Sequence, residues 1–478
     1  MKMGNLTPVL VTECVPGDSF QIGCDSLIRF APMVAPVMHR MDVSVHYFFV
    51  PNRLTWDNWE KYIVDANTPN PLPYINYTDD FTADQKKFLD YMGVPPNTGT
   101  GITQALNALP IAAYQAIYNE YYRDENLISE VDYTLSDGNN TGDVTDLVKM
   151  RQRAWEHDYF TASLPFAQKG TAVDIPIGTI DTDVAVNWNS LETDFAYVQG
   201  SPSGGISEQR QVGNSAGVST TGNPRMIAKT SQLEVEPTTI NDLRRAFRLQ
   251  EWLEKNARGG TRYIENILMH FGVRSSDKRL QRPEYITGLK TPVIISEVLN
   301  TSATAEEAQG NMAGHGVAVS TGKYGNYFCE EHGYIIGIMS VMPQPAYQQG
   351  IPKTYLKSDP LDFFWPSFAH IGEQPVTNNE LYAYTATAED TFGYVPRYAE
   401  YKYQPSRVAG DFRTVLDYWH LGRIFATQPA LNQAFIECDP DQVERIFAVQ
   451  DGEDNLYCQI MHKIKAVRPM PKFGTPNF

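Results

Sequence analysis

The chain has 478 residues, 42% of them hydrophobic and 12% aromatic, and a formal net charge of −17 at pH 7. This length allows one sheet domain with long insertions or two to three ordinary domains, and the acidic charge argues against a surface that is cationic throughout and wraps phosphate. No apolar run approaches membrane-spanning length and the start lacks an apolar signal block, so we expect neither membrane insertion nor Sec-type export.

The five cysteines form no Cys-x-x-Cys pair and are odd in number. Disulfide frameworks need paired cysteines and an oxidising compartment. The cysteines therefore predict reduced thiols in a protein made in a cytoplasm.

The first fifty residues read as strands broken by turns. From Val37 to Phe49 the odd positions are mostly apolar and the even positions are mixed. A period of two predicts a long strand with one face against a core, and Pro51 should end it. Trp56 and Trp59 follow at helical spacing, so the strand should lead into an aromatic helix.

From residue 52 to about residue 160 the pattern becomes helical. Thr82 and Gln85 match a capping box before an apolar run. Residues 104–122 carry apolar side chains near one helical face. Pro110 lies within this stretch, so it must kink the helix or begin a new one.

Residues 178–237 are rich in Gly, Ser, Thr, Asn and Gln and lack periodicity, which predicts an exposed polar loop. A second helix should follow, because Thr239 and Asp242 match a capping box and Gly259 with Gly260 would close it. This helix begins the most basic part of the chain. Residues 241–290 hold eleven Lys or Arg against six Asp or Glu.

Strand patterns return at residues 292–299, 317–328, 334–342 and 456–466, after or around a Tyr- and Pro-rich stretch at 345–425. Strands therefore cluster at both ends of the chain, with helices and loops between them. There is no internal repeat and no alternation of strands and helices. We predict a mainly β protein, an antiparallel barrel or sandwich with large helical and loop insertions.

Four short motifs resemble catalytic or ligand sites and fail on spacing or context. We therefore predict no catalytic residue, no metal site and no cofactor. A Gly-x-Ser-x-Gly motif at 213–217 lies inside a polar loop, and a motif at 316–323 resembles a phosphate-binding loop but has one residue too many between its glycines. A Cys-Glu-Glu-His cluster at 329–332 lacks a second pair of metal ligands. A calcium-like loop that starts at Asp137 has Val148 at the position of the closing carboxylate.

Within the basic stretch, residues 274–282 have fewer neighbouring acids than the preceding helix, so they are the better candidates for contact with phosphate. The alternative is a solvated helix face whose arginines pair with nearby glutamates. Tyr263 and Phe271 could stack on bases. The candidate DNA-contacting residues are Arg274, Lys278, Arg279 and Arg282.

Several long blocks of the chain resemble the major capsid protein of microviruses, which are small tailless single-stranded-DNA bacteriophages, and the match is nearest to the gokushovirus branch. Together these blocks span most of the chain. They are VPGDSF at 15–20, RFAPMVAPVMHR at 29–40, FFVPNRLTWDNWE at 48–60, LRRAFRLQEWLEKNARGGTRYIE at 243–265, FGVRSSDKRLQRPEYI at 271–286 and EYKYQPSRVAGDFR at 400–413.

The resemblance implies a single jelly-roll antiparallel β-barrel that assembles in many copies into a T=1 icosahedral shell around circular single-stranded DNA. Expected partners are further copies of the chain, the genome, a small basic DNA-packaging protein, a pilot protein, an internal scaffolding protein and a host cell-surface receptor. Assembly would take place in the bacterial cytoplasm and the product would be the virion. The mixed face of the long strand could then pack against inserted helices or a neighbouring subunit, which would account for Met38 and Phe48.

In this interpretation residues 1–478 form one jelly-roll domain. The strands lie mainly at 9–50, 165–178, 286–343 and 434–467. The insertions are helical at 52–160, polar and exposed at 178–237, basic and helical at 239–282, and Tyr- and Pro-rich at 345–425. The polar insertion would form a protrusion at the threefold axes, with Gly204, Gly205, Ser215 and Gly217 as candidate host-facing residues.

A different class of function remains open from the residues alone. A carbohydrate-binding or hydrolytic β-sandwich would use aromatic side chains as sugar platforms and a pair of carboxylates in a cleft. No pair stands out in the sequence.

Overall fold

The computed structural model describes residues 1–64, 71–171, 173, 186–188, 226–228, 240–260, 262–299, 312–322, 324–449 and 454–471. The chain divides into two compact units. Unit 1 comprises residues 1–169 and 254–478, and unit 2 comprises residues 170–253. Helix α5 (Ile240–Gly259) crosses the boundary between them.

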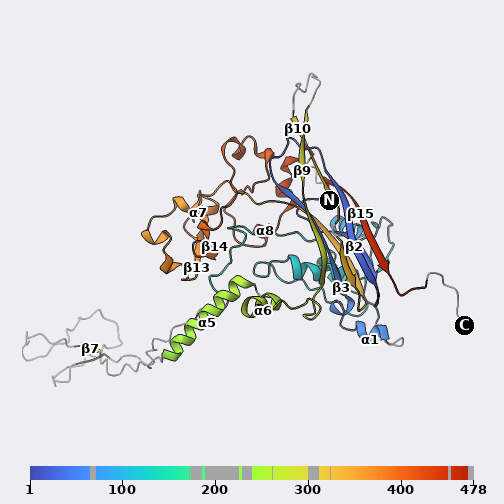
Figure 1. Cartoon of the computed structure of the whole chain (residues 1–478), viewed down its shortest axis with the longest axis horizontal. Helices are drawn as coiled ribbons and strands as arrows, with labels where there is room; N and C mark the ends of the chain where they lie inside the picture. Colours follow the sequence, from blue (N-terminus) through green and yellow to red (C-terminus); the bar gives the residue numbers. More distant parts are fainter. Residues whose placement is uncertain are drawn as a thin grey trace, which may run out of the picture. The chain divides into compact units, whose positions relative to one another are not determined.

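Two antiparallel sheets form the centre of unit 1 (Figure 1). The four-stranded sheet has the order β1-β12-β3-β8, with β1 (Thr7–Cys14), β12 (Gly333–Pro343), β3 (Met41–Pro51) and β8 (Glu284–Pro292). The five-stranded sheet has the order β11-β2-β10-β9, with β11 (Gly325–Phe328), β2 (Ser19–Phe30), β10 (Met312–Ser320), β9 (Ile294–Leu299), and β15 (Leu456–Val467) paired with β2. The predicted mainly β, antiparallel architecture with insertions is confirmed.

Strand β3 is buried on both faces. Its odd residues, among them Tyr47 and Phe49, join a core that includes Ile22 and Phe30 of the facing sheet. Its even residue Phe48 lies in a second core formed with the helical insertion. The prediction of a strand with one buried face was therefore incomplete, because the insertion covers the other face.

The limits of this strand also follow from the structure. The predicted end at Pro51 is confirmed, whereas the strand begins at Met41 rather than Val37. Phe48 packs against the insertion as expected, but Met38 lies before the strand and is 74% exposed.

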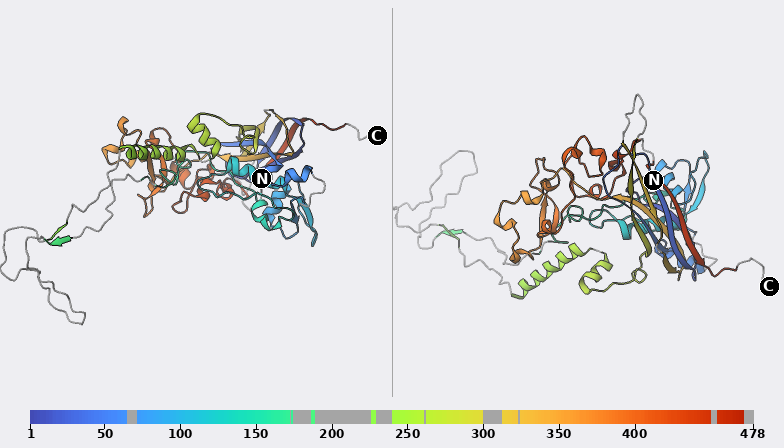
Figure 2. Two further views of the ribbon diagram at one scale, coloured as in Figure 1. Left: turned by 90° about the horizontal axis from the view of Figure 1, so that it is seen from below. Right: turned by 45° about the horizontal axis from the view of Figure 1, so that its top comes forward.

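The insertion after β3 covers the outer face of the four-stranded sheet, and Figure 2 shows its cyan and light-blue elements on one side of the strands. Its helices are α1 (Trp59–Val64), α2 (Ala83–Tyr91), α3 (Leu109–Ile117) and α4 (Val144–Leu147), and its two strands are β4 (Tyr74–Tyr77) and β5 (Gln104–Asn107).

Two helix starts in the insertion match the sequence. The Thr82 hydroxyl accepts the Gln85 backbone N–H at 3.2 Å and the Gln85 side chain accepts the Thr82 N–H at 2.9 Å, which confirms the capping box. Helix α3 begins beside Pro110, so the proline starts a new helix. The expected helix over residues 104–107 is wrong, because these residues pair with β4 and the Asn107 side chain accepts the Leu109 N–H at 3.0 Å.

The Tyr- and Pro-rich stretch packs around a third core. This core contains Tyr159, Phe160, Tyr347, Phe392 and Phe435. The regular elements around it are β13 (Glu373–Thr377), α7 (Asn378–Leu381), β14 (Thr391–Pro396) and α8 (Gln433–Ile436), and α9 (Pro440–Val443) follows them.

The basic and polar insertions are described in part. Helix α5 ends at Gly259 as predicted, while Thr239 of its expected capping box lies outside the described residues. Helix α6 (Tyr263–Phe271) follows in unit 1 and ends at Gly272, whose φ of 68° suits glycine.

In unit 2 the structure describes β6 (Val186–Trp188) and β7 (Met226–Ala228), which pair with each other. Of the strand expected at 165–178, residues 165–171 form bends, and most of the rest lies outside the described residues.

Candidate functional site

The four candidate DNA-contacting residues lie on one loop of unit 1, here called the basic loop and defined as residues 274–282. It connects α6 to β8. Arg274 and Arg279 are exposed, and no ion pair joins either of them to an acid in the part of the chain that the structure describes. Two of the four predicted cations are therefore free to meet an anion.

The other two cations of the basic loop have acidic partners. Lys278 pairs with Glu330, and their side chains are 39% and 60% exposed. An ion pair this exposed contributes little stability, so Lys278 could exchange its partner for a phosphate. Glu330, one of the possible metal ligands at 329–332, is thus engaged in an ion pair.

Arg282 holds the loop in place. Its side chain is 10% exposed and lies 3.6 Å from a carboxylate oxygen of Glu120 and 3.4 Å from one of Asp277. Its guanidinium also lies 4.6 Å from the centre of the Tyr121 ring. Arg282 is therefore occupied in positioning the loop, and the two exposed arginines are the better candidates for contact with DNA.

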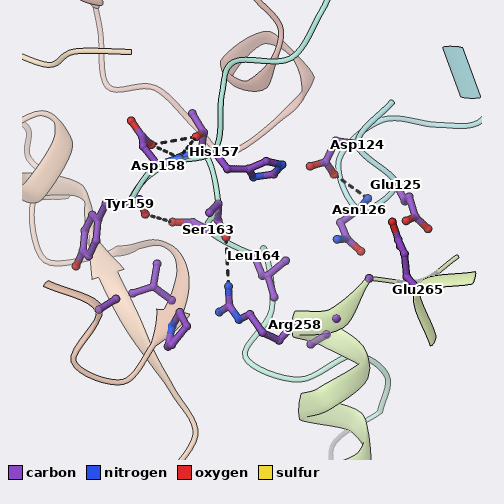
Figure 3. Close-up of a pocket in the computed structure, with 18 of the residues that line it drawn as sticks. Asp124, Glu125, Asn126, His157, Asp158, Tyr159, Ser163, Leu164, Arg258 and Glu265 are labelled. Carbon is purple, nitrogen blue, oxygen red and sulfur yellow. Dashed lines mark hydrogen bonds between the residues drawn. The ribbon is translucent and has the colours of Figure 1, made fainter. Parts of the chain in front are cut away.

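A charged cavity of about 430 Å³ lies where the insertion, the end of α5 and the start of α6 meet (Figure 3). Asp124, Glu125 and Asn126 lie on one side, and Arg258 and Glu265 come from the helical segment. Arg258 donates to the Ala162 carbonyl at 3.3 Å and pairs with Glu373.

Charges in this cavity neutralise one another. Arg262 lies 3.2 Å from a carboxylate oxygen of Glu125 and 3.6 Å from one of Glu265, and it donates to the Asn119 carbonyl at 2.6 Å. Burial raises the pKa of the Glu265 carboxyl, and the adjacent Glu125 raises it further while Arg262 opposes the shift. No sequence pattern indicates this cluster, because its members come from distant segments.

Hydrolytic chemistry finds no support in this cavity. The Ser163 hydroxyl donates to the Tyr159 carbonyl at 3.1 Å, so it is bonded to main chain and not to a general base (Figure 3). The arrangement joins α6 and the insertion through partly buried ion pairs.

The candidate host-facing residues Gly204, Gly205, Ser215 and Gly217 lie outside the described residues, as does the Gly-x-Ser-x-Gly motif. Their expected role stays a prediction. Among the described residues, no helix is both long and apolar enough to cross a bilayer.

The outer face of the five-stranded sheet carries exposed apolar side chains. In register, Ile294, Val317, Arg29 and Tyr457 form one row across β9, β10, β2 and β15. Ile294 is 71% exposed. Val319, Tyr457, Met461 and Val467 are also exposed. Monomeric proteins rarely leave such a face uncovered, so it fits a contact surface for another protein chain.

Comparison with known proteins gives consistent matches over the whole length. Residues 1–478 match the family described as capsid protein (F protein). The chain is 36% identical over 501 aligned residues to capsid protein VP1 of Bdellovibrio phage phiMH2K, covering 99% of this chain and 92% of that protein. It is 34% identical to capsid protein VP1 of Chlamydia phage 1, covering 99% and 93%, and 31% identical to that of Spiroplasma virus 4, covering 100% and 92%.

Proposed function

The chain belongs to the capsid protein (F protein) family, and from this membership we propose that it builds a T=1 icosahedral shell around a circular single-stranded DNA genome. It is a major capsid protein, and its place is the virion. The match along all 478 residues carries this conclusion. The two facing antiparallel sheets support a single jelly-roll domain as its framework.

Assembly is the central function in this proposal. The exposed apolar side chains on the five-stranded sheet, such as Ile294 and Tyr457, support it, because burying them against another subunit is favourable by about 25 cal/mol for each Å² of apolar surface. The test is to size purified protein by light scattering and negative-stain microscopy. Uniform shells are expected, and only monomer in the presence of the other virion proteins would refute the proposal.

Genome enclosure would use local cationic patches, since the net charge of −17 makes the subunit a poor counterion for DNA. A small basic packaging protein would supply the remaining positive charge. Changing Arg274, Lys278 and Arg279 to serine should lower packaged DNA more than shell yield. Equal loss of both would instead mean that the basic loop serves folding or subunit contact.

Host attachment is assigned to the polar insertion at 178–237, and a pilot protein and an internal scaffolding protein complete the expected partners. Deleting residues 204–222 should leave shell yield intact and lower adsorption to host cells. Adsorption equal to that of the unmodified virion would remove the attachment role from this insertion.

A further inference from the structure

An aromatic pocket opens beside the basic loop. It has a volume of about 550 Å³, within the range of small-ligand sites. Its walls come from β3, the end of the helical insertion and β8. The lining residues used below are His46, Phe48, Tyr121, Tyr122, Arg153, Trp155, Glu156 and Tyr285.

Aromatic rings make up most of the pocket wall. Phe48 lies at its base with Tyr121, Tyr122 and Tyr285 around it, at centroid distances of 4.7, 6.0 and 5.6 Å. His46 stacks on Tyr122 and bonds to its hydroxyl at 2.7 Å. Tyr285 is 47% exposed, so its ring is available to a ligand.

One cation in the pocket has no carboxylate partner among the described residues, and one buried donor near it has no acceptor there. Trp155 is 97% buried, and its indole N–H has no partner in the described part of the chain. That N–H is itself buried in the inner core, so it is not available to a ligand in the pocket. The Arg153 guanidinium donates to the Ser340 hydroxyl at 2.7 Å, and among the described residues no carboxylate pairs with it.

The carboxylate in the pocket is already engaged. Glu156 pairs with Lys290, which also lies 3.3 Å from Asp42. The pocket therefore offers ring faces, N–H donors and an unpaired positive charge. A sugar fits less well, because its hydroxyl groups would need free acceptors and Glu156 is already paired. A basic peptide fits less well, because the positive charge of Arg153 would repel it.

The basic loop is fastened to the pocket wall. The Tyr121 hydroxyl donates to the Asp277 carboxylate at 3.0 Å and to the Pro283 carbonyl at 2.6 Å. The exposed Arg274 and Arg279 are on this same loop. The pocket and the basic loop together therefore match a ligand that has a flat ring, acceptor atoms on that ring and a negatively charged chain.

We propose that this pocket holds one unstacked nucleobase of single-stranded DNA, with its ring against the exposed Tyr285 and its ring acceptors toward the Arg153 guanidinium. The backbone phosphates would lie toward Arg153 and the basic loop. The inference rests on the proposed genome enclosure and adds to it a base-binding position within each subunit. Such stacking tolerates any base sequence, as a coat that encloses a whole genome requires.

The test compares two oligonucleotides of equal charge, an oligothymidylate of about 12 nucleotides and its abasic counterpart, by fluorescence anisotropy with the full-length protein. The unmodified protein should bind the oligothymidylate more tightly. Tyr285→Leu should lower that affinity about tenfold and leave the abasic affinity unchanged.

Tyr384→Leu is the matched control, since Tyr384 is 91% exposed and does not line the pocket. Changing Arg274 and Arg279 to serine should weaken both oligonucleotides alike. The inference is overturned if Tyr285→Leu binds as the unmodified protein does, or binds both oligonucleotides equally weakly, or if an acidic peptide competes while DNA does not. Shell formation, measured in parallel, reports separately on the capsid function.

Discussion

Replacing His46 with glutamine should make the subunit less sensitive to mild acid. Burial, and to a smaller extent the nearby Arg153, lower the pKa of His46 from 6.5 to about 4. The folded protein therefore holds this imidazole neutral, while the unfolded chain binds a proton below pH 6.5. Stability is complete above that pH and falls as the pH drops toward 4.

The size of this effect follows from the two pKa values. At pH 5 the unfolded state gains about 2 kcal/mol from protonation of His46, and the full loss at lower pH is about 3 kcal/mol. Glutamine retains a polar partner for the Tyr122 hydroxyl and does not titrate. Between pH 7.5 and pH 5, the variant should therefore lose about 2 kcal/mol less free energy of unfolding than the unmodified protein.

Urea unfolding of the soluble subunit, followed by tryptophan fluorescence at both pH values, measures this difference. His39, His420 and His462 also have a lowered pKa because of burial, so both proteins should lose some stability in acid. The exposed His370 provides the control variant His370→Gln. An unchanged pH dependence in His46→Gln would refute the reasoning.

Two further changes test the packing. Phe48→Ala should lower the free energy of unfolding by about 3–5 kcal/mol, because the ring is 1% exposed between β3 and the insertion, while Val319→Ala on the exposed sheet face should change it by less than about 0.5 kcal/mol. Arg282→Met should cost about 1–3 kcal/mol by removing the cation beside Asp277 and one of the two beside Glu120, and proteolysis should then cut the basic loop faster. Unchanged urea midpoints would contradict both.

Much of the fold could be predicted from local patterns. The period of two identified β3, the capping box identified α2, and Pro110 marked the start of α3. Local patterns failed where distant partners decide the outcome. Residues 104–107 form a strand because β4 supplies the hydrogen bonds, and the pattern of residues 104–107 does not indicate that partner.

The candidate site was likewise predictable only where its residues are close together in the sequence. A cluster of cations on one short segment is visible in the sequence, so the four candidate residues were named, whereas the expected helical insertion at 239–282 ends at Phe271 and leaves them in a loop. Which of its members are engaged depends on Glu120 and Glu330, which lie far away along the chain. The aromatic pocket was missed, because His46, Trp155 and Tyr285 come from three separate segments.

The order of strands in the four-stranded sheet has a consequence for biosynthesis. Strand β3 lies between β12 and β8, and roughly 280 residues separate its end at Pro51 from the start of β12 at Gly333. At ribosomal rates of about 5–20 residues per second, β3 waits roughly 15–60 s for that neighbour. The helical insertion emerges immediately after β3 and packs on Phe48, so it can shield one side of a nascent hydrophobic strand from aggregation until translation delivers its partners.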